Sequence, residues 1–384
     1  MFNAVVILGS AESAPLIRSV VAATGQVTVM RELPAPPGDY ELSRIIHSLL
    51  PDIVFIDLSP GHAALQCMAR IRELSPRLPV IGFGASPEAR LLVRHLGAAG
   101  LAAPDGSPDE LRVTIREAME AVHGGIEEHL YAFLPSKAGS GCSTVVLHTA
   151  IAAAALQKKV LVIDADLRSS VLGFMLGVTP VGGTQAVLQA ASNLDAFILR
   201  RNLTQQHGVD FLLSTRSLDA ELPEWINYFQ LLNFVLGSYD LILVDLPELI
   251  NPATVEVIRR AKTIFPVCTT ELPSLKLNEQ RLVELGRLNV PDERIGLLVN
   301  RYSRTSPPLE EIGQTFGRKV AHSFPNDYPA VAQSIREASP IRSESELARA
   351  FNAFAAALAG VEIAPPPPLT LKDRLKGLLN LASA

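Results

Sequence analysis

A segment rich in glycine and serine, residues 136–144, constrains the fold of this chain most. It follows an apolar run at 130–134 and precedes a helical run at 145–156. A strand, a loop of small residues and a helix in this order curl the main chain so that N–H groups and the helix N-terminus face an anion. The segment therefore predicts a phosphate-binding loop in a parallel α/β domain.

The loop departs from the regular phosphate-binding motif at two positions. Ser136 stands where the motif has its first glycine, and Cys142 stands where it has a lysine. Ser143 occupies the position of the hydroxyl that binds Mg²⁺. We expect nucleotide binding with impaired catalysis, because Cys142 cannot supply the lysine's cation. Two alternatives remain: an ordinary Gly/Ser-rich turn, and a redox-sensing Cys142 whose thiol pKa is lowered by the helix N-terminus.

Two further apolar runs end in aspartate. Residues 160–163 precede Asp164 and Asp166, and residues 241–244 precede Asp245. Continuous apolar runs of this length are typical of buried parallel strands, and ligands bind at the carboxyl ends of such strands. We expect Ser143, Asp164 and Asp245 to hold Mg²⁺ beside a bound nucleotide, although a strand-end aspartate can also merely cap the next helix.

The first 123 residues alternate short apolar strands with helical periods. One helical period places Leu42, Ile45, Ile46 and Leu49 on one face. The pattern predicts a flavodoxin-like, doubly wound domain over 1–123, and the glycine pair at 124–125 predicts a connector over 124–129. A second doubly wound domain over 130–360 is implied by the family resemblance given below. The expected strands of the first domain are 4–8, 27–30, 53–56, 80–83 and 100–103.

Composition limits the remaining possibilities. The 384 residues suffice for two domains, and no apolar run reaches the ~20 residues that span a bilayer. No secretory leader pattern opens the chain, and its three cysteines lack metal-binding spacing, so we expect a cytoplasmic protein. The net charge of -5 gives no support for nonspecific DNA binding.

The first domain resembles a response-regulator receiver domain. Asp57 stands where that family has its phosphate-accepting aspartate, but Gly9 and Ser10 replace the acidic residues that help to hold Mg²⁺. Gly84 and Pro104 replace the hydroxyl and lysine that follow the fourth and fifth strands. The resemblance therefore implies a pseudo-receiver that serves docking or dimerisation. We expect Asp57 to be unphosphorylated and to act as a solvated strand-end or capping residue.

The second domain resembles the deviant P-loop ATPases of the MinD/ParA class, and more specifically the CpaE/TadZ pilus-assembly proteins, which often lack the usual lysine. Lys137 matches the signature lysine that reaches the partner's nucleotide, and Asp166 matches the carboxylate that positions the attacking water. Asp245 matches the Walker B aspartate. The resemblance implies nucleotide contacts by Lys137, Ala138, Gly139, Ser140, Gly141, Cys142, Ser143, Thr144, Asn300, Arg301, Pro325, Asn326 and Asp327.

Several of these residues also have purely structural interpretations. Lys137 can be an ordinary exposed lysine, Asp166 a helix cap, and Asn300 the acceptor of a hydrogen bond within its own turn.

The resemblance implies ATP and Mg²⁺ as cofactors and a homodimer that sandwiches two nucleotides. It further implies a localisation factor for a type IV (Tad/Flp) pilus or secretion machine, with partners at the cell pole and hydrolysis that is slow or absent. A partitioning ATPase that binds DNA or membrane is the first alternative. A scaffold that binds no nucleotide is the second.

A separate tail over 361–384 is expected after the second domain. Four prolines at 365–368 require an extended chain, and Leu371, Leu375, Leu378 and Leu379 then recur at helical spacing among basic residues. Such a short amphipathic segment is suited to an anionic membrane or to a groove on a partner, and a frayed end is the alternative.

Overall fold

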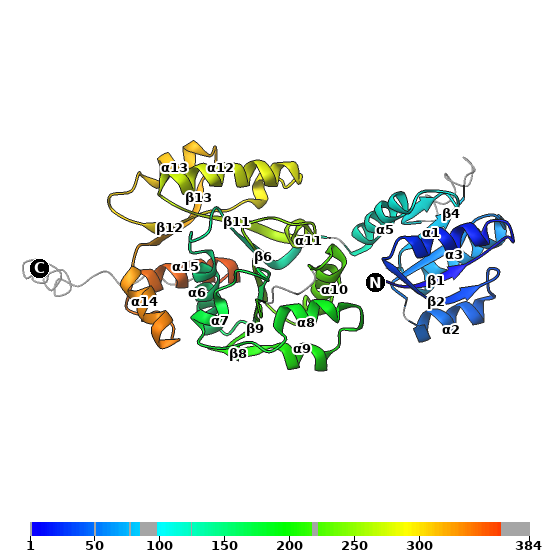
Figure 1. The fold of residues 1–384 in the computed structure, drawn as a ribbon, viewed down its shortest axis with the longest axis horizontal. Coiled ribbons are helices and arrows are strands. Elements are labelled where there is room, and N and C mark those ends of the chain that lie inside the picture. Colours follow the sequence, from blue (N-terminus) through cyan, green and yellow to red (C-terminus); the bar gives the residue numbers. More distant parts are fainter. Residues whose placement is uncertain are drawn as a thin grey trace, which may run out of the picture.

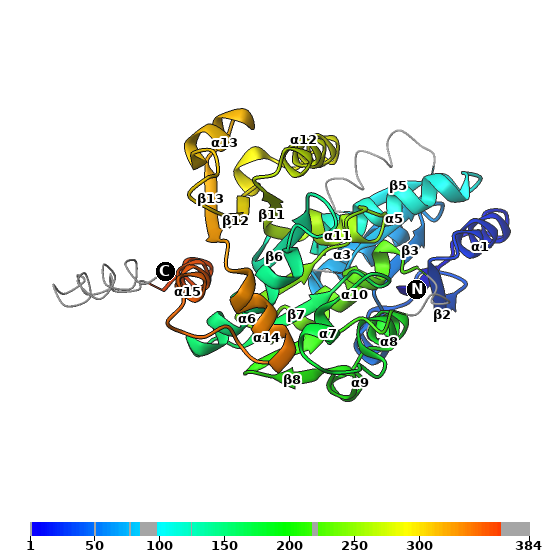
Figure 2. The same ribbon diagram turned by 60° about the vertical axis from the view of Figure 1, so that its left-hand side comes forward.

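The computed structural model describes residues 2–49, 51–76, 78–84, 98–123, 125–216 and 222–361. The chain forms two α/β units, each built around its own sheet (Figure 1). A view turned by 60° shows the same two units (Figure 2).

The first sheet is entirely parallel, in the order β2-β1-β3-β4-β5. The five strands expected from the sequence are present, with their ends shifted by a few residues. Apolar side chains fill both faces of the sheet, and of those expected on one face of α2, Leu42, Ile45 and Ile46 are buried and Leu49 is partly buried. The elements are β1 Phe2–Ile7, α1 Ala14–Ala23, β2 Val27–Leu33, α2 Asp39–Leu49, β3 Ile53–Asp57, α3 His62–Leu74, β4 Val80–Phe83, β5 Gly100–Ala102 and α5 Pro108–His123.

The second sheet has the strand order β13-β12-β11-β6-β10-β7-β9-β8. Its pairs are parallel except for β8 with β9. Helices cover both faces, which explains why its central strands are continuous apolar runs. The strands are β6 Glu127–Pro135, β7 Val160–Asp164, β8 Thr204–Gln206, β9 Val209–Leu212, β10 Leu241–Asp245, β11 Ala261–Thr269, β12 Leu297–Tyr302 and β13 Val320–Pro325.

The helices of this unit connect those strands. They are α6 Cys142–Ala155, α7 Leu172–Met175, α8 Gly183–Gln189, α9 Ala196–Asn202, α10 Trp225–Val235, α11 Thr254–Arg260, α12 Leu272–Arg287, α13 Leu309–Thr315, α14 Tyr328–Glu337 and α15 Glu346–Ala359, with 3-10 turns at Ala191–Asn193 and Asp292–Arg294.

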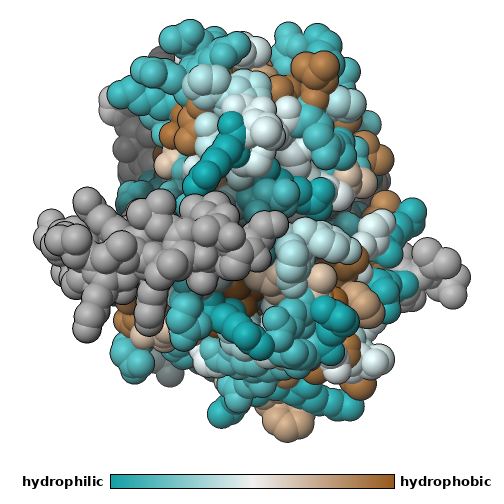
Figure 3. All heavy atoms as spheres, turned by 90° about the vertical axis from the view of Figure 1, so that its left-hand side faces the viewer, coloured by the Kyte–Doolittle hydropathy of each residue, from teal (hydrophilic) through white to brown (hydrophobic). Residues whose placement is uncertain are grey.

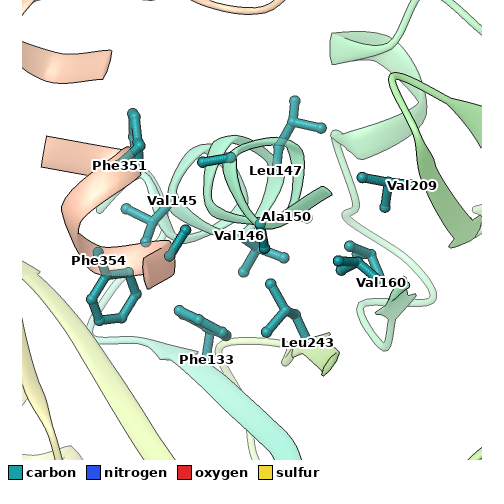
Figure 4. Packing of buried hydrophobic residues seen from close by; sticks show 14 of the residues in the cluster. Phe133, Val145, Val146, Leu147, Ala150, Val160, Val209, Leu243, Phe351 and Phe354 are labelled. Carbon is teal, nitrogen blue, oxygen red and sulfur yellow. The ribbon is translucent and has the colours of Figure 1, made fainter. Parts of the chain in front are cut away.

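Helix α6, which follows the glycine-rich loop, is buried on several sides. It lies between Phe351 and Phe354 of α15 and the strands that carry Phe133 and Leu243 (Figure 4). A helix that is apolar all round belongs in the interior. The N-terminus of α6, and with it the loop, is therefore fixed by the core.

The expected tail, with the amphipathic segment at 371–379, lies outside the described residues, which end at 361. Within the described part, no helix has the length and apolarity needed to cross a membrane. On the face that carries α14 and α15, apolar side chains are interspersed with hydrophilic ones (Figure 3).

Candidate functional site

The glycine-rich loop and both strand-end aspartates meet at one edge of the second sheet. Strand β10 lies between β6, which leads into the loop, and β7. The register places Asp245 opposite Asp164. The loop and Asp245 border a cavity of about 760 Å³, a size typical of small-molecule sites, whereas Asp164 is fully buried beside Asp245 and does not line the cavity. Residues 138–144 line it, together with Asp166, Arg168, Tyr228, Asp245, Glu248 and Arg301 among others.

The loop has the tight curvature that its composition predicts. Gly139 and Gly141 have φ angles of 78° and 85°, in the left-handed region that favours glycine. The side-chain amide of Asn300 donates a hydrogen bond of 2.9 Å to the carbonyl oxygen of Ser140. A Cβ atom at Gly141 would lie 2.2 Å from that amide nitrogen. Asn300 therefore supports the loop from behind, and a side chain at position 141 would displace it.

The two strand-end carboxylates form a buried acidic pair. Burial raises the pKa of Asp245 to about 6, against hydrogen bonds from Ser143 and Cys142 that lower it. Burial and then the charge of Asp245 raise the pKa of Asp164 well above its usual range. Ser170 Oγ and the Ser214 N–H donate to one oxygen of Asp164. Its other oxygen is buried without a hydrogen-bond partner among the described residues.

This geometry fits a magnesium ion. Asp245 and the Ser143 hydroxyl line the cavity and are suitable ligands, and a cation bound there would relieve the repulsion between Asp245 and the buried Asp164 behind it. No group of three or more His, Cys, Asp or Glu side chains forms a metal cluster in the described part of the chain. Water and phosphate oxygens would therefore complete the coordination, as is usual for Mg²⁺ in nucleotide sites.

The burial of Cys142 contradicts the alternative that this residue is a redox sensor. Its side chain is buried, and burial, followed by the nearby Asp245, raises the thiol pKa well above its ordinary value. A reactive cysteine needs a lowered pKa and access to solvent. Cys142 is instead a small neutral side chain at the position where the regular motif places a cation.

Glu248 is a residue of this site that the sequence reasoning missed. Its Oε2 accepts a 2.8 Å hydrogen bond from the main-chain N–H of Ala138, so a carboxylate occupies one of the loop's anion-binding donors. Its Oε1 lies 3.8 Å from Nη2 of Arg281 on α12. Its position in the sequence could have predicted its role, because Glu248 follows Asp245 by three residues and therefore belongs to the loop that leaves the same strand end.

Lys137 and Asp166, the two residues expected to act in catalysis, lie in different surroundings. Lys137 Nζ is 3.5 Å from Oε2 of Glu271, its side chain is 26% exposed, and it is not among the described residues that line the cavity. Asp166 does line the cavity. It accepts hydrogen bonds from the N–H groups of Arg168 and Ser169, which is the geometry of a capping turn.

Most of the residues expected around the base do not line the cavity. Arg301 does, whereas Asn300 supports the loop, and its Oδ1 accepts from the N–H of Arg301. Asn326 donates its N–H to the carbonyl of Tyr302, and Asp327 caps α14 through the N–H of Ala330. The remaining expected residue, Pro325, ends β13 and is also outside the lining.

Asp57 in the first domain is buried, so the expectation of a solvated carboxylate is wrong. It accepts hydrogen bonds from the N–H groups of Gly9, Ser10 and Ser59 and from the hydroxyl of Ser13. These donors lie in the loops that follow β1 and β3. The carboxylate therefore ties the two loops together, and its structural hydrogen bonds account for its burial.

Comparison with known proteins finds relatives that match about 60% of the chain. No protein-family model matches the chain. An uncharacterised ATP-binding protein of Methanocaldococcus jannaschii is 25% identical over 245 residues, covering 62% of this chain and 89% of the relative. The septum site-determining protein MinD of Helicobacter pylori is 24% identical over 241 residues, covering 59% of this chain and 89% of that protein.

Solved structures show the same fold. A ParA family ATPase from Chlorobium tepidum superposes with a TM-score of 0.56 and 23% identity, covering 59% of this chain and 97% of that one. The MinC:MinD cell division complex from Aquifex aeolicus gives 0.52 and 20% identity, covering 62% and 98%.

The loop, the strand-end aspartates and the parallel sheet define a P-loop domain. About 60% of the chain is homologous to the MinD/ParA group of P-loop ATPases.

Proposed function

We propose that this protein is an ATP-binding switch of the MinD/ParA type in which hydrolysis is slow or absent. One observation carries the proposal: the buried pair Asp164 and Asp245 lies with Ser143 beside a glycine-rich loop, while the neutral Cys142 replaces the usual cation. The pair suits Mg²⁺, and the loop amides suit phosphate.

Binding and catalysis depend differently on the missing lysine. A charge-assisted hydrogen bond is worth about 1.5–3 kcal/mol, or about ten- to hundredfold in affinity. The loop amides and the N-terminus of α6 remain, so ATP binding should be weakened and retained. When bound, Mg²⁺ neutralises phosphate charge beside Ser143 and Asp245. Phosphoryl transfer relies mainly on positioned cations, so hydrolysis should suffer more than binding.

Dimerisation would complete the site. Lys137 pairs with Glu271 and does not line its own cavity, so in a dimer it would exchange Glu271 for the nucleotide of the second subunit. Phe174 and Leu249 line the cavity with exposed fractions of 66% and 75%. A partner subunit would cover such apolar side chains. We propose an ATP-dependent homodimer in which Lys137 of each subunit contacts the nucleotide of the other.

The proposed process is the localisation or assembly of a type IV (Tad/Flp) pilus or secretion machine at the cell pole. It rests on the resemblance to CpaE/TadZ proteins. The first domain is consistent with a pseudo-receiver, because its parallel order β2-β1-β3-β4-β5 is that of flavodoxin-like sheets. The structural hydrogen bonds of Asp57 support a docking role over phosphorylation.

Calorimetry of the full chain with Mg-ATP tests the proposal. We expect saturable binding that depends on Mg²⁺ and is weakened at least tenfold by Asp245→Asn. Asp195→Asn is the matched control, because Asp195 caps α9 outside the cavity, and it should bind ATP as the wild type does. The absence of binding at millimolar Mg-ATP would contradict the proposal and favour the scaffold. ATP-dependent, salt-sensitive DNA binding would favour the partitioning ATPase.

A further inference from the structure

Helix α10 has two faces with different neighbours. Trp225 and Phe229, four residues apart, lie on one face of the helix, as the 3.6-residue period requires. Tyr228 lies on another face and lines the nucleotide cavity. Leu222 and Pro223, which lead into the helix, line the same cavity. The helix is thus part of the cavity wall.

The Trp225/Phe229 face receives the first strand of the N-terminal domain. The ring centroid of Phe2 is 5.7 Å from that of Trp225 and 5.9 Å from that of Phe229. Phe2 is fully buried, and it packs in one apolar cluster with the core of its own domain and with Ile226 and Phe229. Both ribbon views show α10 on the side of its unit that faces the N-terminal domain (Figures 1 and 2).

A buried arginine reinforces this junction. Arg260 at the end of α11 forms a 2.8 Å ion pair with Glu127, the first residue of β6. Its guanidinium lies 5.4 Å from the ring centroid of Phe229 and donates to the Phe229 carbonyl oxygen at 3.4 Å. The strand β6 begins at Glu127, inside the expected connector 124–129, and Arg260 links this residue to the same helix that contacts Phe2.

The cavity face of α10 is placed to respond to a ligand. Tyr228 is buried, and its hydroxyl has no hydrogen-bond partner among the described residues. Burial and then the charges of Asp164 and Asp166 raise the pKa of the Tyr228 hydroxyl. Tyr228 lines the same cavity as the loop and Asp245, where phosphate and Mg²⁺ would bind, so occupancy of the cavity changes the packing and the charge that Tyr228 experiences.

We propose that α10 is the surface through which the nucleotide cavity acts on the N-terminal domain. Tyr228 and Phe229 are consecutive residues of one helix that is packed on both sides, and close-packed interiors transmit displacement. A shift of α10 at Tyr228 moves Trp225 and Phe229 against Phe2. The docking partner of this surface is the N-terminal end of β1, at Phe2, in the chain's own N-terminal domain. The inference rests on the proposed function, since it requires that a nucleotide enters the cavity.

The chain carries its own probe for this inference, because Trp225 is its single tryptophan. Excitation of Trp225 in the full-length wild type during titration with Mg-ATP should change its emission. The change should saturate over the same ATP range as the calorimetric binding. Trp225 does not line the cavity, so the signal reports on the junction. If calorimetry detects ATP binding while the emission of Trp225 does not change, the inference is overturned and the proposed function stays intact.

Phe2→Leu tests the coupling from the N-terminal side of the junction. It removes the ring contacts and keeps an apolar side chain. Because coupling between two sites is reciprocal, loosening the junction should change ATP affinity by about fivefold or more and reduce the emission change. Phe55→Leu is the matched control: Phe55 is equally buried in the same domain and pairs with Phe83. It should leave both readouts as in the wild type.

Two outcomes distinguish failure of this inference from failure of the proposed function. If Phe2→Leu leaves both ATP affinity and the ATP-induced emission change as in the wild type, the signal arises within the cavity wall and the inference is wrong. If calorimetry detects no ATP binding in the wild type, the proposed function fails and this inference fails with it.

Discussion

The carboxylate of Glu248 gives the sharpest quantitative prediction. It accepts a hydrogen bond of 2.8 Å from the Ala138 N–H, a donor that the loop would otherwise present to phosphate. An entering terminal phosphate must displace this carboxylate or bind beside it. Glu248→Gln removes the negative charge and keeps an amide oxygen that can accept the same hydrogen bond, so the loop should retain its shape.

The magnitude follows from Coulomb's law. Two like charges about 5 Å apart repel by about 3 kcal/mol at an effective dielectric constant of 20. The Glu248 side chain is 37% exposed, so solvent and salt should reduce this to about 1–1.5 kcal/mol. Glu248→Gln should therefore tighten Mg-ATP binding by about tenfold. The gain for Mg-ADP, which lacks the third phosphate, should be smaller.

Calorimetric titration of both nucleotides against both variants measures this difference. Glu279→Gln is the matched control, because Glu279 pairs with Lys276 on the exposed side of α12 and does not line the cavity. It should change neither affinity. An unchanged ATP affinity in Glu248→Gln, or an equal gain for ATP and ADP, would refute the reasoning.

Three other predictions concern the loop position 142, the dimer contact of Lys137 and the buried His148. Cys142→Lys should tighten Mg-ATP binding by about tenfold or more and raise hydrolysis, measured by calorimetry and phosphate release. Lys137→Ala should abolish ATP-dependent dimerisation in light scattering while sparing monomer binding, and unchanged dimerisation would exclude the sandwich. Burial lowers the pKa of His148 from 6.5 to about 4, so the unfolded state binds its proton first as pH falls. The free energy of unfolding should therefore decrease between pH 6.5 and 4, by about 3 kcal/mol at most, and His148→Phe should remove that part of the slope in denaturant titrations.

The strand-end aspartates were predictable because their positions follow from local pattern. An apolar run ending in Asp164 or Asp245 places the carboxylate at the carboxyl edge of a buried strand, and parallel order brings both edges together. Gly139 and Gly141 were predictable for the same reason, since the loop requires a left-handed backbone at both.

Other features depend on contacts between distant segments, which no local pattern contains. The hydrogen bond from Asn300 to Ser140 joins residues 160 positions apart. Glu248 reaches Ala138 across 110 positions. Asp57 is buried because loops after two different strands donate to it. The contact of Phe2 with α10 likewise requires the arrangement of two domains.

The most direct test of the account is a crystal structure of the full chain with Mg²⁺ and a non-hydrolysable ATP analogue. The account predicts a triphosphate held by main-chain amides between Gly139 and Ser143, with a metal ion beside Ser143 and Asp245 and the Glu248 carboxylate moved off the Ala138 N–H. A cavity that stays empty at saturating analogue, with Glu248 still bound to the loop, would contradict it.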